Sequence, residues 1–262
     1  MNLDARSSFN DYLKELNSDI TPIKNNSENL TPQATTIVAV VFNQGVLMAG
    51  DRRATMGHIV AQKDIEKVFP ADSESIIGIA GSAGIALELV KLFQVELEHY
   101  EKIEGTQLSV EGKANRLSVL LRGNLGLAFQ GLAALPLFAA FDTKQQKGRV
   151  FSYDVTGGRY EEHQYYAVGS GSVFAKSALK KMHQENMDEK LAIRVSLESL
   201  YDAAEEDSAT AGPDLNRKIF PVVGVVTKQG YRRVTEKELD ELVSKIIDER
   251  RSRPDGPIAR FS

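Results

Sequence analysis

The sequence contains no cysteine and only four histidines. The absence of cysteine excludes disulfide bonds, thiolate zinc sites and a cysteine nucleophile. The histidines are scattered without the paired spacing that seats a metal ion, at His58, His99, His163 and His183. We therefore expect neither a metal site nor a cofactor.

Long hydrophobic runs and basic stretches are lacking as well. No run approaches the apolar length of a membrane span, and residues 1–7 lead into no apolar segment of a secretory signal. The net charge is -4, and the sequence has no stripe of lysine and arginine with interleaved aromatic residues that would bind a nucleic acid. We expect a cytoplasmic protein without membrane or nucleic-acid partners. The 262 residues, 42% of them hydrophobic, suffice for one large domain or two small ones.

Blocks of strands alternate with pairs of helices. β-branched residues predict a strand over 35–42, whose hairpin partner, 46–51, follows the turn at 43–45. Further strands are expected at 64–69, 75–80, 137–141, 148–154, 161–168, 219–227 and 231–235. Helical spacing of apolar residues predicts helices from 81–84 to Gly105, from 109 to before Pro136, and over 172–184, 190–206 and 237–250.

This order of elements predicts the fold class. Paired helices between strand blocks do not suit a parallel sheet, but they suit two stacked antiparallel sheets with a helical layer outside each. We expect an α+β, four-layer αββα sandwich. The first two helices should bury Ile85, Leu87, Leu89, Val90, Phe93, Leu97, Leu117, Leu120, Leu121, Leu125 and Phe129.

The two ends of the chain differ from the rest. Apolar residues at helical spacing (Phe9, Tyr12, Leu13, Leu16) indicate a short amphipathic helix, followed by a polar linker up to residue 34. Such a leader can be a tail, a docking helix or a removable segment. Residues 251–262 are expected to form a flexible tail.

Six short motifs in a fixed order carry a resemblance to a known family. They are residues 34–39 (ATTIVA), 50–55 (GDRRAT), 66–68 (EKV), 78–82 (GIAGS), 169–172 (GSGS) and 201–210 (YDAAEEDSAT). Together they resemble the catalytic β subunits of 20S proteasomes, a family of N-terminal nucleophile hydrolases. Residues 95–102 (VELEHYEK) and 122–125 (RGNL) are similar to the actinobacterial type. The resemblance covers about residues 35–250.

The resemblance implies a threonine endopeptidase made as a precursor. Residues 1–34 would be a propeptide removed by self-cleavage between Ala34 and Thr35, leaving residues 35–262 as the catalytic domain. A threonine hydroxyl is a poor nucleophile near neutral pH and needs an adjacent base. The α-amino group freed at Thr35 would supply that base, since its reference pKa is about 8. The leader thus has a chemical reason to exist.

Other site residues follow from the same resemblance. Asp51 and Lys67 stand 16 and 32 residues after Thr35, and we expect Asp51 to hold a charged Lys67 beside the nucleophile. The backbone N–H of Gly81 would form the oxyanion hole. The supporting cluster around the Thr35 amine would consist of Ser170, Asp207 and Thr210. Arg53 is interpreted as structural.

The substrate pocket should be apolar. The family's positions fall on Ala54, Thr55, Ile65, Phe69, Ile79, Ala83 and Leu87. No acidic residue is expected there, so we predict cleavage of unfolded proteins after apolar or aromatic residues.

The resemblance also implies partners: α subunits and other β subunits in four stacked seven-membered rings, a ring ATPase regulator, and unfolded or tagged proteins.

Three alternatives remain open. Position 34 is alanine, where the family usually has glycine. The alanine can slow processing or mark a chain held as precursor. Thr36 is a second candidate nucleophile, although the spacings favour Thr35. There are two rival functions: a smaller HslV-like peptidase, and a non-catalytic ring subunit with an uncleaved leader.

Overall fold

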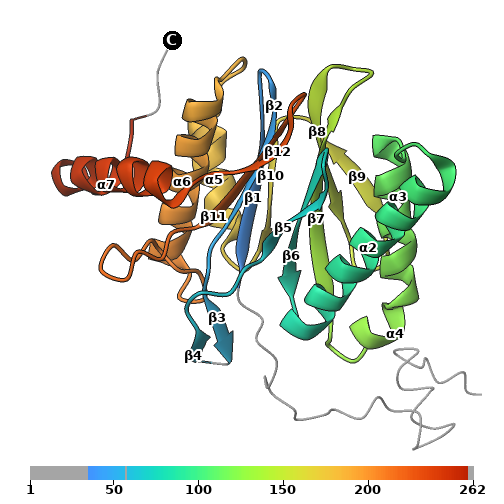
Figure 1. Ribbon diagram of the computed structural model, residues 1–262. Helices are drawn as coiled ribbons and strands as arrows, with labels where there is room; N and C mark the ends of the chain where they lie inside the picture. The colour runs from blue at the N-terminus through green and yellow to red at the C-terminus, as the bar shows by residue number, and fades with distance from the viewer. Residues whose placement is uncertain (1–34, 57, 259–262) are drawn as a thin grey trace, which may run out of the picture. The chain divides into compact units, whose positions relative to one another are not determined.

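The computed structural model describes residues 35–56 and 58–258, in which two antiparallel sheets stack between layers of helices (Figure 1). The first sheet has the strand order β10-β1-β2-β11-β12. Its strands are β1 (Thr36–Phe42), β2 (Gly45–Gly50), β10 (Tyr165–Gly169), β11 (Val222–Thr227) and β12 (Gly230–Arg233). The second sheet has the sequential order β5-β6-β7-β8-β9. It contains β5 (Val68–Asp72), β6 (Ser75–Gly81), β7 (Ala134–Asp142), β8 (Lys147–Tyr153) and β9 (Arg159–Glu162).

Helices cover the outer face of each sheet. The second sheet is covered by α2 (Ala83–Glu104) and α3 (Val110–Gly123), with the short α4 (Leu125–Ala128) after them. The first sheet is covered by α5 (Ser172–Met182) and α6 (Glu189–Glu206), and α7 (Glu236–Ser252) packs against α6. The predicted αββα sandwich is therefore confirmed for the described residues. None of their helices has both the length and the apolar character needed to cross a membrane.

Strand β1 shows how the layers are joined. Its alternate residues enter two different cores, because successive side chains of a strand point to opposite faces. Ile37 and Ala39 pack between the two sheets, whereas Val38 and Val40 pack under α5 and α6. All four are fully buried, which explains why the segment reads as a continuous apolar run. A third core lies between the second sheet and α2 and α3.

Several predicted elements differ from the structure. The predicted strand over 161–168 is two strands, β9 and β10, which belong to different sheets and are separated by the bend at 163–164. The predicted strand over 64–69 begins only at Val68. A short hairpin, β3 (Ala54–Met56) with β4 (Ile59–Gln62), was not predicted. Its β4 is exposed throughout, so no buried-face alternation marks it.

The helical predictions differ from the structure in several details. The second helix ends at Gly123 instead of continuing toward Pro136, and Phe129 beyond α4 is 84% exposed. Leu87 of α2 is also exposed, because it borders a pocket described below. At the other end, α7 includes Arg251 and Ser252, which the sequence assigned to a tail. The leader helix predicted within 9–16 lies outside the described residues.

Arg149 of β8 joins the second sheet to α3. Its guanidinium, 6% exposed, donates to Glu161 of β9 at 2.8 and 2.7 Å and to Asp142 of β7 at 3.1 Å. It also pairs with Glu111 in the first turn of α3. Hydrogen bonds from Arg149 lower the pKa of Glu161 and of Glu111 below its usual value. This cluster therefore stabilises the fold while these carboxylates are ionised.

We predict that Arg149→Ala lowers the free energy of unfolding by about 3 kcal/mol at neutral pH, since it leaves partly buried carboxylates unpaired. Because their folded pKa values are lowered, the wild-type advantage is fully present above the unfolded pKa of about 4.3. The difference in unfolding free energy between wild type and variant shrinks as the pH falls through the pKa values of the folded state. Urea unfolding between pH 3 and pH 7 measures this difference.

Arg251→Ala provides the matched control, because Arg251 forms only an exposed i,i+3 pair with Asp248. Its effect should stay below about 0.5 kcal/mol at every pH. Equal losses for the two variants, or a loss for Arg149→Ala that does not depend on pH, would contradict the role assigned to the cluster.

Candidate active site

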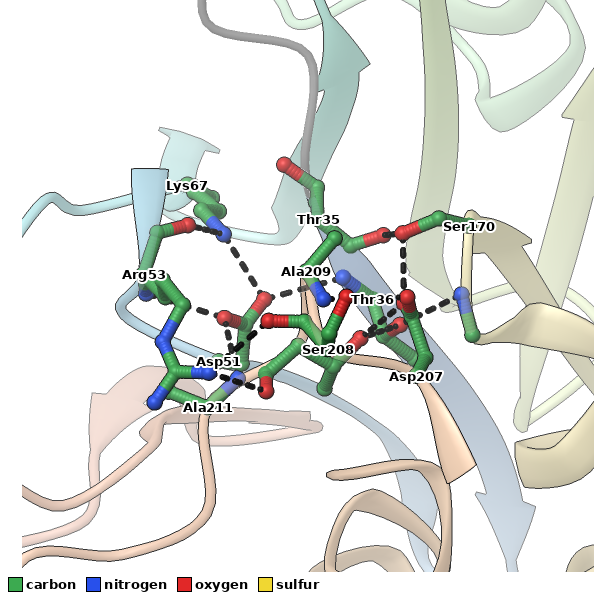
Figure 2. Close-up of polar contacts among 12 residues, drawn as sticks. Thr35, Thr36, Asp51, Arg53, Lys67, Ser170, Asp207, Ser208, Ala209 and Ala211 are labelled. Carbon is green, nitrogen blue, oxygen red and sulfur yellow. Dashed lines mark hydrogen bonds and ion pairs between the residues drawn. The ribbon is translucent and has the colours of Figure 1, made fainter. Parts of the chain in front are cut away.

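Thr35 lies immediately before β1. The end of the neighbouring strand, β10, holds its backbone in place. The Thr35 carbonyl accepts a hydrogen bond of 2.9 Å from Ser170 N. Ser170 Oγ lies 3.4 Å from the same carbonyl oxygen, but its proton is directed to Asp207 Oδ2 at 2.6 Å. Gly169 permits this approach: its φ is +102°, and a Cβ there would lie 1.9 Å from the Thr35 carbonyl oxygen. Figure 2 shows the Thr35 hydroxyl directed away from Ser170. The backbone of Thr35 is thus fixed on one side while its hydroxyl faces the other.

Asp51, just after β2, accepts hydrogen bonds from four donors. Its Oδ1 accepts from Thr36 N at 2.9 Å and from Lys67 Nζ at 2.7 Å. Its Oδ2 accepts from Arg53 N at 2.9 Å and from Ala211 N at 3.1 Å (Figure 2). The residue is 1% exposed. A buried carboxylate needs such partners, since burying an unpaired charge is very costly.

Lys67 is the cation of this pair and is 5% exposed. Its Nζ donates to Asp51 Oδ1 and to the Arg53 carbonyl oxygen. Burial lowers the pKa of Lys67 from its usual value, and the neighbouring Asp51 carboxylate opposes that effect. The structure contains the ion pair between Asp51 and Lys67 that the resemblance implied.

A chain of hydroxyl groups runs behind Thr35. Gly171 N donates to Thr36 Oγ1 at 3.0 Å, Thr36 Oγ1 lies 2.6 Å from Thr210 Oγ1, and Thr210 Oγ1 donates to Asp207 Oδ2 at 2.6 Å. Because a hydroxyl carries one proton, and that of Thr210 goes to Asp207, Thr36 must be the donor to Thr210. The Thr36 hydroxyl is therefore engaged both as donor and as acceptor, with no exposure to solvent.

Asp207, which follows the last residue of α6, accepts the final hydrogen bond of this series of hydroxyl groups. It also accepts from Ser170 Oγ at 2.6 Å and from Ala209 N at 3.0 Å. Burial alone would raise the pKa of Asp207, but hydrogen bonds from Ser170, Thr210 and Ala209 outweigh it and lower the pKa. The structure thus brings Ser170, Asp207 and Thr210 together, around the carbonyl of Thr35 and the side chain of Thr36.

A narrow pocket opens beside Thr35. Its accessible volume is about 20 Å³, and its lining consists of Thr35, Ala54, Ile65, Glu66, Lys67, Ile79, Gly81, Ala83, Ala86 and Leu87. This space holds about one water molecule. Thr35, Lys67 and Gly81, which come from separate segments of the chain, therefore share one cavity.

Gly81 has a backbone conformation suited to its place at the end of β6. Its φ is +113°, and a Cβ would lie 2.2 Å from the Ala133 carbonyl oxygen. Two residues earlier, Ile79 N donates to the Lys67 carbonyl. Amides two residues apart in a strand point to the same edge, so the N–H of Gly81 is directed to the side of Lys67.

The expected substrate-binding residues divide into two groups. Ala54, Ile65, Ile79, Ala83 and Leu87 line the pocket, but Thr55 and Phe69 are not part of its lining. Phe69 packs against the core beneath α2, and Thr55 is half-buried on β3. The expected absence of an acidic residue was wrong, because Glu66 belongs to the lining. Its carboxylate is paired with Arg233 of β12 at 2.6 Å.

The sequence analysis missed donors that are backbone groups. The N–H groups of Gly171 and Ala211 complete the bonding of Thr36 and Asp51, and no side-chain pattern could mark them. Arg53 has the structural position that was expected: its guanidinium donates to the carbonyls of Ser208 and Thr210. Among residues 35–56 and 58–258, no cluster of histidine and acidic side chains could hold a metal ion.

Comparison with known proteins agrees with this geometry. The family model described as proteasome subunit matches residues 31–214. A proteasome subunit beta of Streptomyces griseus is 54% identical over 258 residues, which cover 97% of this chain and 92% of that protein. A proteasome subunit beta of Acidothermus cellulolyticus is 60% identical over 232 residues, covering 87% of this chain and 80% of that protein. The chain therefore belongs to the proteasome subunit family, and it is a β-type member, a threonine endopeptidase subunit.

Proposed function

We propose that Thr35 is the nucleophile of this peptidase and becomes active when residues 1–34 are removed. The observation that carries the proposal is the single pocket that Thr35 shares with Lys67 and Gly81. Removal of the leader would turn the Thr35 nitrogen from an amide, which is not basic, into an amine with a reference pKa of about 8. The same residue would then hold both the attacking hydroxyl and its base.

The hydrogen bonds of Thr36 favour Thr35 over Thr36. The Thr36 hydroxyl proton is used in the bond to Thr210, and its oxygen accepts from Gly171 N. Attack by Thr36 would break both bonds and leave buried polar groups unsatisfied, at a cost of about 1–3 kcal/mol for each group. Thr36 also lies outside the lining of the pocket.

The proposed reaction is acyl transfer followed by hydrolysis. Thr35 Oγ adds to the carbonyl carbon of the scissile peptide bond, and its proton passes to the Thr35 amine. The Gly81 N–H stabilises the oxyanion. The C–N bond then breaks, the leaving amine takes the proton, and water cleaves the remaining ester. A charged Lys67, held by Asp51, keeps the nearby amine unprotonated and stabilises the developing alkoxide.

The lining supports a preference for apolar residues before the scissile bond. Ala54, Ile65 and Ile79 are apolar, and the one acid, Glu66, is neutralised by Arg233. An accessible volume of about 20 Å³ admits no large side chain without some widening. Side chains at the border of the pocket, such as the exposed Leu87, would have to move to provide it.

Assembly and location form the wider part of the proposal. The chain would join α subunits and other β subunits in four stacked seven-membered rings, in the cytoplasm, with its sites facing the inner chamber. A ring ATPase would deliver unfolded or tagged proteins. Ala34 lies outside the described residues, so its influence on self-cleavage remains a prediction. The HslV-like alternative is disfavoured by the relatives above, which are proteasome β subunits.

We predict that a peptide β-lactone or boronate modifies Thr35 in assembled, leader-free particles. The hydroxyl of Thr35 is the one placed beside both Lys67 and Gly81. After β-lactone treatment, peptide mapping by mass spectrometry should locate one ester on Thr35 in each β subunit. An ester on Thr36, or full inhibition with Thr35 unmodified, would contradict the proposal.

We also predict opposite outcomes for two variants at position 35. Thr35→Ala should retain the leader after assembly and lose at least about 10³-fold in peptidase activity, because the hydroxyl is absent. Thr35→Ser keeps the hydroxyl and should retain processing and measurable activity. Intact-mass measurement of the assembled β subunit shows whether residues 1–34 are gone.

The mass of the wild-type subunit also distinguishes an active peptidase from a latent ring subunit with an uncleaved leader. Loss of residues 1–34 from wild type together with retention in Thr35→Ala supports self-cleavage by Thr35. A wild-type chain that stays full-length in assembled particles indicates a latent ring subunit.

A further inference from the structure

A second pocket is lined in part by Arg52 and Arg53, which follow Asp51 in the chain. Its volume is about 220 Å³. The apolar part of its lining is the segment Ile219, Phe220 and Pro221, which leads into β11. The polar part comes from two distant segments of the chain, 52–63 and 211–217. This volume is below that of pockets for drug-sized ligands, which start near 300 Å³.

The charges of this lining are strongly unbalanced. Its cations are Arg52, Arg53, Lys63 and Arg217, and its one acid is Asp214. Asp214 is already paired, since it accepts from Arg217 Nη1 at 2.7 Å and from Arg217 N at 2.9 Å. The hydrogen bond from the Arg217 side chain also lowers the pKa of Asp214. Arg52, Arg53 and Lys63 form no ion pair with a carboxylate of the described lining, although Arg52 interacts electrostatically with Glu66, and Arg53 with Asp207, outside it.

The two arginines are bonded to neutral oxygens. Arg53 Nη1 donates to the carbonyls of Ser208 and Thr210, and Arg52 Nη2 donates to the carbonyl of Asp64 at 2.7 Å. These bonds orient the guanidinium groups but do not neutralise them.

We propose that this pocket binds a small oxyanion, a carboxylate or a phosphate. Such an anion would compensate the charge of the Arg52 and Arg53 guanidinium groups and of the Lys63 ammonium. Planar guanidinium groups bind carboxylate and phosphate oxygens with the most favourable geometry among side chains. The proposal is independent of the identity of the nucleophile.

The pocket is adjacent to the active-site ion pair. Arg53 and Ala211, which line it, both donate their backbone N–H to Asp51 Oδ2 (Figure 2). The Arg53 carbonyl accepts from Lys67 Nζ. The pocket is therefore connected to the Asp51 carboxylate through the backbone of two of its lining residues.

The test is a titration of the full-length chain with inorganic phosphate at constant ionic strength, balanced with sodium chloride. A ligand that binds the folded state raises the midpoint of thermal unfolding in a concentration-dependent way. We expect this rise in wild type and at least a tenfold increase in the apparent Kd for Arg52→Gln. Lys63→Gln, at an exposed position, should weaken binding without disturbing the fold. Lys228→Gln, an exposed cation outside the lining, is the matched control and should behave as wild type.

Two results would overturn the proposal: no midpoint rise beyond that in chloride, or an equal rise in wild type, Arg52→Gln and Lys63→Gln. A second arm replaces phosphate with a short peptide containing glutamate, with its glutamine counterpart as control. If the acidic peptide binds and competes with phosphate, the natural anion is a peptide carboxylate. If phosphate alone binds, the natural anion is free phosphate.

Discussion

The site depends on one buried carboxylate, that of Asp51. It accepts hydrogen bonds from Thr36 at the start of β1, from Lys67, from Arg53 and from Ala211 beyond α6. Each charge-assisted bond contributes about 1.5–3 kcal/mol when its partner is present. A single side chain thus holds the start of β1, the Lys67 ammonium and the loop after α6 in one arrangement.

The layers of the fold could be predicted because periodicity follows burial. Helices with one apolar face and strands with dense β-branched residues gave the αββα order correctly. The failures occurred where burial does not follow the sequence pattern. The stretch 161–168 is evenly β-prone, yet it crosses from one sheet to the other, and only the bend at 163–164 marks the change. Phe129 is apolar but exposed, so an apolar residue alone did not predict an inward position.

The candidate site could be predicted only in its side chains. The motifs around Thr35, Asp51, Lys67 and Gly81 named residues that the structure does bring together. The hydroxyl chain from Thr36 to Asp207 could not be foreseen, because its geometry depends on how β1 and β10 meet at Gly169. Glu66 shows the same limit: its place in the pocket and its pairing with Arg233 depend on the packing of β12.

We propose that Asp51 acts by holding Lys67 beside Thr35, and Asp51→Asn in assembled, leader-free particles tests this most directly. Asparagine keeps the shape but replaces one acceptor oxygen with an NH₂ group. The account predicts that the rate of Thr35 acylation by a β-lactone falls at least about 100-fold, while far-UV circular dichroism and assembly stay unchanged. An acylation rate within about twofold of wild type would contradict it.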